Sequence, residues 1–371
     1  MSTLSACIVV KNGKASIIRC LDALLPMANE YVVIDTGSTD GTLELLASWV
    51  KKHPRQRVVH ECVGSKFHDS DGVFDFGAAK NYAISKATCD YVMWVDVNDI
   101  LLNGKHARKL FESITYRYPS AGITMLTKVT PTFSFPRMRI IRRTYAEFRG
   151  IIHEIVVNKD ENAPTVRTQL VFENYKESRD IGRNLKALLK VWDKEQTQRT
   201  AFYLGNSYKD MNDYGHAFEW YCVTIDMFPD THNEDRFKAM ETICEMIYAT
   251  KTDLEEMGYR ALQMIEERPD MPEGYYYRAR YNYEIGDMPF AMKCLEKILT
   301  LRKKPSGNLW INREIYDRRN IMNLLTLVRE QQVRMEAEQW KYADPIQPEY
   351  IGTGYPAYDQ GYGPGYNGFG F

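Results

Sequence analysis

Three oxygen-bearing side chains follow an apolar run in the first third of the chain. Residues 91–95 (YVMWV) are apolar or aromatic, as expected for a buried strand, and the segment then turns polar at Asp96, Asn98 and Asp99. Carboxylate and amide oxygens at a strand end are suitable ligands for a hard divalent ion such as Mg²⁺ or Mn²⁺. A single Asp after a strand is also a common helix cap or turn residue, and this alternative stays open above all for Asp99.

A second apolar run ends in the same way. Residues 31–34 (YVVI) precede the loop DTGSTDG, which contains Asp35, Ser38 and Asp40. Asp35 is placed where its carboxylate can accept hydrogen bonds from a base or a ribose. A turn that leads into a helix, with Asp40 as a cap, explains the loop without any ligand.

Strand and helix patterns alternate around these two loops. Strands are expected at 6–10, 31–34, 57–61 and 91–95, and helices at 17–24, 42–50 and 77–87. This alternation predicts an α/β fold with a mostly parallel sheet that is covered on both faces. In such sheets ligands bind beyond the carboxyl ends of the strands, where both polar loops are expected.

The pattern becomes helical after about residue 180. The segment 201–229 fits a tetratricopeptide repeat at Leu204, Gly205, Tyr208, Ala217 and Tyr221, and a related unit follows near 275–299. A generic helical bundle is the alternative. We expect domains at 1–180 (α/β) and 181–340 (all-α repeats), and a Gly/Tyr-rich tail at 341–371 that lacks periodicity and is expected to be disordered.

Composition limits the classes of partner. The chain has 371 residues, with 48 basic and 49 acidic side chains, so no global charge attracts nucleic acid or a membrane. The seven cysteines form no CxxC pair, which favours reduced thiols over disulfides or zinc. Neither a signal peptide pattern nor an apolar stretch of ~20 residues is found, so we expect a cytoplasmic protein without membrane contact.

Five motifs occur in an order that resembles a known family. CIVVKN, EYVVIDTGSTDGT, FDFGAAKNYAISKATCDYVMWVDVND, MRIIRR and FRGIIHE together resemble glycosyltransferase family 2, which has the GT-A fold. The chain is most similar to the branch that joins this domain to tetratricopeptide repeats and includes the peptide S-glycosyltransferases of glycopeptide bacteriocins. The resemblance implies inverting, metal-dependent transfer of a hexosyl or pentosyl group from a UDP-sugar.

The resemblance also implies roles for single residues at the donor. Asp35 would bind the uracil or ribose, and Lys80 stands where the family usually has Arg, beside Asn81, in a pair that meets the phosphates and sugar. The other residues implied at the donor are Val9, Asn12, Ser38, Asp40 and Arg142. In the cluster RMRIIRR we expect one arginine at the donor and the rest at the surface.

The ion and the base are implied in the same way. Asp96, Asn98 and His153 would hold Mn²⁺ or Mg²⁺, although Asn98 replaces the second aspartate of the family motif and offers only a neutral oxygen. Either Glu154 or Asp99 would take the acceptor proton, and Glu154 is preferred.

The acceptor stays open among three classes. They are a peptide or protein side chain, a modified DNA base such as hydroxymethylcytosine, and a saccharide or lipid-linked glycan. The basic segments RKK at 302–304 and REIYDRR at 313–319 would suit phosphate contacts. A rival hypothesis is a catalytically degenerate scaffold that lost its metal through Asn98 and binds partners through the repeats.

Overall fold

The computed structural model describes residues 2–129, 134–174, 181–227, 234–301 and 313–342, so the predicted tail lies almost entirely outside the described residues. Strands and helices alternate in the first part of the chain. In order they are β1 (Leu4–Val10), α1 (Ile17–Leu24), β2 (Glu30–Asp35), α2 (Thr42–Lys52), β3 (Arg57–Cys62), α3 (Phe76–Lys86), β4 (Tyr91–Asp96), β5 (Asp99–Leu101), α4 (Gly104–Arg117), β6 (Gly122–Lys128), β7 (Ser134–Arg142), η1 (Arg143–Tyr145), β8 (Ala146–Arg149), β9 (Ile155–Asn158) and β10 (Thr165–Asn174).

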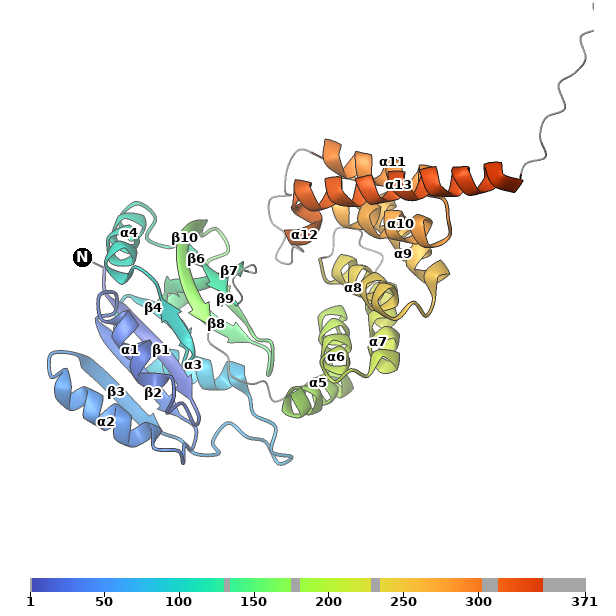
Figure 1. Ribbon diagram of the computed structural model, residues 1–371. Helices are drawn as coiled ribbons and strands as arrows, with labels where there is room; N and C mark the ends of the chain where they lie inside the picture. The colour runs from blue at the N-terminus through green and yellow to red at the C-terminus, as the bar shows by residue number, and fades with distance from the viewer. Residues whose placement is uncertain (1, 130–133, 175–180, 228–233, 302–312, 343–371) are drawn as a thin grey trace, which may run out of the picture.

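Eight of these strands form one mixed sheet in the order β3-β2-β1-β4-β7-β6-β10-β5 (Figure 1). Strands β3, β2, β1 and β4 are parallel to one another. Strand β7 runs antiparallel to both of its neighbours, β4 and β6. Strands β8 and β9 pair separately as a hairpin. The predicted α/β fold with a mostly parallel sheet is confirmed, since four of the seven strand pairings in this sheet are parallel.

Both faces of the sheet are covered, as the sequence predicts. Alternate residues of β1 point to opposite sides: Ile8 joins the core under α1, whereas Cys7 joins the core under α3. Such double burial explains why β1, β2 and β4 read as continuous apolar runs. The polar residues can therefore lie only where these strands end.

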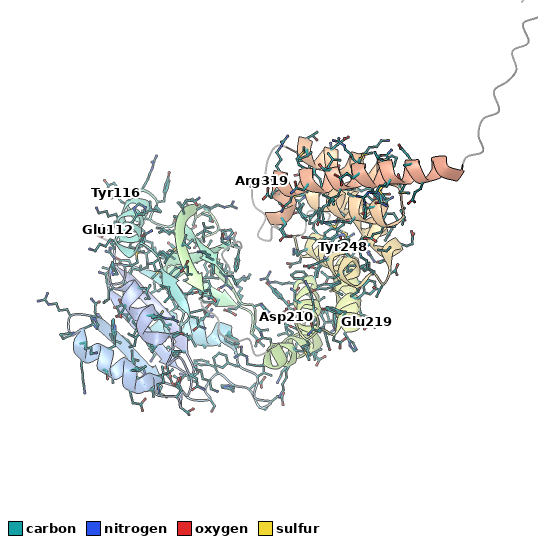
Figure 2. All side chains as sticks on the ribbon, viewed as in Figure 1. Glu112, Tyr116, Asp210, Glu219, Tyr248 and Arg319 are labelled. Carbon is teal, nitrogen blue, oxygen red and sulfur yellow. The ribbon has the colours of Figure 1, made fainter. Side chains whose placement is uncertain are left out.

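The second part of the chain is helical. Its elements are α5 (Ile181–Lys194), α6 (Gln198–Asp210), α7 (Tyr214–Met227), α8 (Glu234–Thr250), α9 (Leu254–Glu267), α10 (Pro272–Glu284), α11 (Met288–Thr300), α12 (Arg313–Tyr316) and α13 (Arg318–Tyr342). Three successive hairpins pack as tetratricopeptide-like repeats, and Asp210, Glu219 and Tyr248 mark α6, α7 and α8 in Figure 2. Gly205 of α6 lets Tyr221 of α7 approach closely, since a Cβ there would lie 2.6 Å from the Tyr221 ring. None of the described helices is both long and apolar enough to cross a membrane.

A buried carboxyl group in the repeats makes stability depend on pH. Burial, followed by the nearby charge of Glu241, raises the pKa of Glu273 from 4.5 to about 8. Between these values the unfolded chain has lost this proton while the folded chain retains it. Folding stability therefore falls as pH rises through this window, at a limiting slope of about 1.4 kcal/mol per pH unit.

We expect Glu273→Gln to remove most of the fall in folding stability between these two pH values. The variant should be more stable than the wild type at pH 8 and should differ less from it at pH 5, as urea denaturation at both pH values would measure. Glu284→Gln, which removes a more exposed partner of Lys251, is the control. An unchanged pH slope in Glu273→Gln would contradict the assignment.

Candidate active site

The two polar loops meet at one edge of the sheet. Val10 of β1 pairs with Asp35, and Val9 pairs with Asp96 on the other side of β1. The two aspartates thus end strands that flank β1, two strand spacings or roughly 10 Å apart. The sheet topology thus brings together Asp35 and Asp96, which are some sixty positions apart in the sequence.

Backbone and side-chain hydrogen bonds join the loops after β1 and β2. The Asn12 N–H donates to Ser38 Oγ (2.8 Å), and Asn12 Oδ1 accepts from the Thr39 N–H (2.9 Å). Asp40 accepts from the Lys14 N–H in one loop and from the Thr42 N–H in the other. Asn12 adopts a positive φ of 53°, which turns the chain after β1. The predicted residues Asn12, Ser38 and Asp40 therefore form one connected rim beside Asp35.

Asp35 has one oxygen bonded and one oxygen unused. Its Oδ1 accepts from the N–H groups of Gly37 and Ser38, both at 2.9 Å. Its Oδ2 is buried and has no hydrogen-bond partner among the described residues. Since a buried unpaired oxygen costs roughly 1–3 kcal/mol, a donor group supplied by a ligand would be favourable here.

A lysine joins two carboxylates at the end of β4. Lys80 Nζ lies 2.5 Å from Glu154 Oε1 and 3.5 Å from Asp96 Oδ1. The side chains of Lys80 and Glu154 are mostly buried, at 11% and 13% exposure, whereas Asp96 is 34% exposed. The structure thus brings together Lys80, Asp96 and Glu154, which come from α3, β4 and the loop before β9.

Three cations surround one indole ring at this site. Lys80 Nζ lies 4.4 Å from the centroid of the Trp94 ring, and the guanidinium carbons of Arg137 and Arg139 lie at 5.0 and 4.0 Å. Arg137 Nη1 also approaches Asp96 Oδ2 at 3.8 Å. Repulsion among three positive charges would disfavour this arrangement, and the attraction between each cation and the aromatic face offsets that repulsion. The ring therefore helps to hold three cations beside the carboxylates of Asp96, Asp99 and Glu154.

The Asp99 carboxylate is buried and has a partner on each oxygen. Its side chain is 0% exposed and paired with Arg139 at 2.8 Å, and its other oxygen accepts from Asn174 Nδ2 at 2.6 Å. Burial lowers the pKa of Arg139, and the Asp99 charge opposes this change. Because one oxygen is used in a buried ion pair and the other in a hydrogen bond, the geometry favours Glu154 over Asp99 as the base, and Asp99 stays the alternative. The expectation that Arg139 is a surface residue is wrong, because its side chain is buried in the same ion pair.

Two of the predicted donor ligands have other roles. Asn81 Nδ2 donates to the Phe148 carbonyl (2.9 Å), and Asn81 Oδ1 accepts from the Phe148 N–H (2.8 Å), so Asn81 fixes β8 on α3. Arg142 pairs in register with Tyr91, at the amino end of β4, because β7 is antiparallel. Asp96 is five positions further along β4, roughly 16 Å away. As arranged, Asn81 supports β8 and Arg142 lies at the far end of β4 from Asp96, so their roles as donor ligands stay predictions that this geometry does not favour.

The predicted metal ligands have other partners in this arrangement. Asn98 Oδ1 accepts from Ser16 Oγ (2.7 Å), and the His153 ring stacks on Tyr203. The described residues contain no group of three His, Cys, Asp or Glu side chains that could hold an ion. Because Asp96 already faces Lys80 and Arg137, these residues do not fit a divalent ion as arranged, and the metal set of Asp96, Asn98 and His153 stays a prediction.

Sequence reasoning missed two side chains at the site, Trp94 and Tyr203, and it did not single out Arg137 within the cluster RMRIIRR. Arg137 and Arg139 are two positions apart on a strand, so they point to the same face, and this spacing is the signal that could have paired them. Trp94 was expected only to be a core residue of its strand. Nothing in the sequence connects Tyr203 with His153, which lies fifty positions earlier.

Residues 5–163 match the model of glycosyl transferase family 2. A TPR repeat-containing protein of Synechococcus elongatus is 27% identical over 160 residues, which cover 42% of this chain and 36% of that protein. The chain therefore spans about a third of the length of this relative.

Among solved structures, S. aureus TarS residues 1–349 are loosely similar. The complex with UDP has a TM-score of 0.36 at 14% identity and covers 76% of this chain and 92% of that chain. The complex with UDP-GlcNAc has a TM-score of 0.34 with the same coverage. Residues 5–163 thus carry the similarity to glycosyltransferase family 2, and tetratricopeptide-like helical repeats follow them in the chain.

Proposed function

We propose that this chain transfers a sugar, with inversion, from a UDP-sugar to an acceptor held near the helical repeats. The observation that carries the proposal is the Lys80 ammonium shared by Asp96 and Glu154 at the carboxyl edge of the sheet. The Lys80 ammonium can interact with the leaving diphosphate, and the adjacent Glu154 carboxylate can take the proton of the acceptor. The unpaired Oδ2 of Asp35 supports the nucleoside end, since the N3–H of uracil or a ribose hydroxyl is the donor it lacks.

Charge explains how the site would assist the reaction. Departure of UDP from the anomeric carbon places negative charge on the diphosphate, and Lys80 and Arg137 are the cations beside Asp96. Glu154 takes the proton of the acceptor O–H or S–H as the new bond to the anomeric carbon forms. The old carbon–oxygen bond breaks, and UDP leaves with the electron pair. No step is derived through a metal ion, because the donor set does not suit one.

The acceptor proposal stays at the level of chemical class. A peptide side chain or a modified DNA base, each with a hydroxyl or thiol nucleophile, can be presented by the repeats beside Glu154. The seven cysteines are unpaired, which supports a reducing, cytoplasmic location. A panel of UDP-sugars with cysteine peptides and hydroxymethylated DNA, read as UDP release, tests both the donor and the acceptor. Absence of turnover with every UDP-sugar would favour the scaffold hypothesis.

We expect Lys80→Met to weaken UDP binding about 10- to 100-fold, because a charge-assisted contact to the diphosphate is lost. Isothermal titration with UDP measures this effect directly. Lys86→Met, on the same helix, is the matched control because Lys86 pairs with Glu61 at the surface. We also expect EDTA to weaken UDP binding less than Lys80→Met does. A larger effect of EDTA would contradict the role given to Lys80.

A further inference from the structure

The helical repeats contact the active-site loop through one pair of rings. The loop between β8 and β9 contains His153 and Glu154, and the imidazole of His153 stacks on the ring of Tyr203 in α6. The ring centroids are 3.7 Å apart and the planes differ by 7°. The residue next to the proposed base is therefore held by a side chain from the other domain.

The loop needs such support because its backbone is unusual. His153 has φ of 49° and Gly150 has φ of 98°. A non-glycine residue in the left-handed region costs of order 1–2 kcal/mol and persists only where its surroundings hold it. On one side this support comes from α3, where the Phe76 N–H donates to the Ile151 carbonyl at 2.9 Å. On the other side it comes from Tyr203.

Tyr203 is itself fixed within the repeats. Its hydroxyl accepts from Arg199 Nη2 at 3.1 Å, and its ring packs beside Phe202 in the core of the repeats. Helix α5 also holds the two domains together, because Lys190 pairs with Asp69 at 2.6 Å and with Asp71. The Tyr203 ring is thus a fixed surface and can limit where His153, and with it Glu154, can lie.

We propose that Tyr203 is a positioning residue: through its stack on His153 it holds Glu154 in the orientation that accepts the proton. The proposal rests on the proposed function, and it makes the first repeat a part of the catalytic unit. In this proposal Tyr203 acts through His153 and makes no contact with the donor. Its loss should therefore lower kcat and leave the KM for the UDP-sugar nearly unchanged.

The test compares variants that keep or remove the flat ring. We expect Tyr203→Leu to lower kcat by up to about 10²-fold, the cost of a small misplacement of a reacting group, whereas Tyr203→Phe should stay within about 2-fold of the wild type. Tyr208→Leu is the matched control, since Tyr208 lies on the same helix and stacks on His216 within the repeats. Equal kcat in Tyr203→Leu and Tyr208→Leu would overturn the proposal.

A second measurement does not depend on activity. Hydrogen exchange of residues 150–154 should become faster in Tyr203→Leu and stay unchanged in Tyr208→Leu. If the wild type transfers no sugar, the proposed function fails, while this exchange still decides whether Tyr203 holds the loop. Unchanged exchange would overturn the positioning role.

A variant of His153, the other residue of the stacked pair, keeps the proposal testable if Tyr203→Leu misfolds. His153→Asn removes the imidazole and keeps a residue that tolerates positive φ. It should lower kcat as much as Tyr203→Leu does, and the double variant should be no worse than either single variant. Additive losses would mean that the two rings act independently and would overturn the proposal.

Discussion

Glu154→Gln should lower kcat for sugar transfer by about 10³-fold, because the amide cannot accept the acceptor proton and general bases contribute roughly 10²–10⁴-fold. UDP affinity should change little, since Lys80 still has Asp96 as a partner and Glu154 faces the acceptor side of the proposed reaction. Steady-state transfer kinetics together with UDP titration measure both quantities. A joint loss of UDP binding would instead make Glu154 a donor-site residue.

Glu147→Gln is the matched control for this experiment. Glu147 lies on β8 of the same hairpin and pairs with Arg149 at the surface, at 3.3 Å. Its loss should leave kcat within about 2-fold of the wild type, because exposed ion pairs contribute little. Asp99→Asn tests the alternative assignment, in which Asp99 is the base. A loss of kcat in Asp99→Asn without a loss of stability would move the base from Glu154 to Asp99.

Arg139→Met should destabilise the N-terminal domain by about 3–5 kcal/mol, because it leaves the Asp99 carboxylate buried without its ion-pair partner. Arg139 and Asp99 are both 0% exposed and lie 2.8 Å apart, so solvent cannot replace the lost charge. For a domain of this size the melting temperature should fall by roughly 10 °C. Thermal unfolding followed by circular dichroism would measure the change.

The double variant Arg139→Met/Asp99→Asn separates the ion pair from simple packing. It removes both charges together, so it should be more stable than Arg139→Met alone. Arg149→Met serves as a surface control and should cost less than about 1 kcal/mol. Equal destabilisation in the single and double variants would show that packing of the Arg139 side chain, rather than its charge, stabilises this region.

The local elements, and the edge of the sheet at which the site lies, can be predicted from the amino-acid sequence. Apolar runs bounded by DTGSTDG and DVND identified β2 and β4, because a strand buried on both faces can place polar residues only at its ends. Parallel order then placed Asp35 and Asp96 at one edge, and the repeat pattern of α6 and α7 followed from local helical spacing. These features depend on neighbours in the chain.

Only the tertiary structure decided which of these side chains work together. Arg142 lies at the wrong end of β4 because β7 runs antiparallel to it, and the pattern of a strand does not reveal its direction. Asp99 is paired with Arg139, forty positions away, and Tyr203 reaches His153 from a different domain. Such contacts join residues that are distant in sequence, and they follow from packing, which a single sequence does not encode locally.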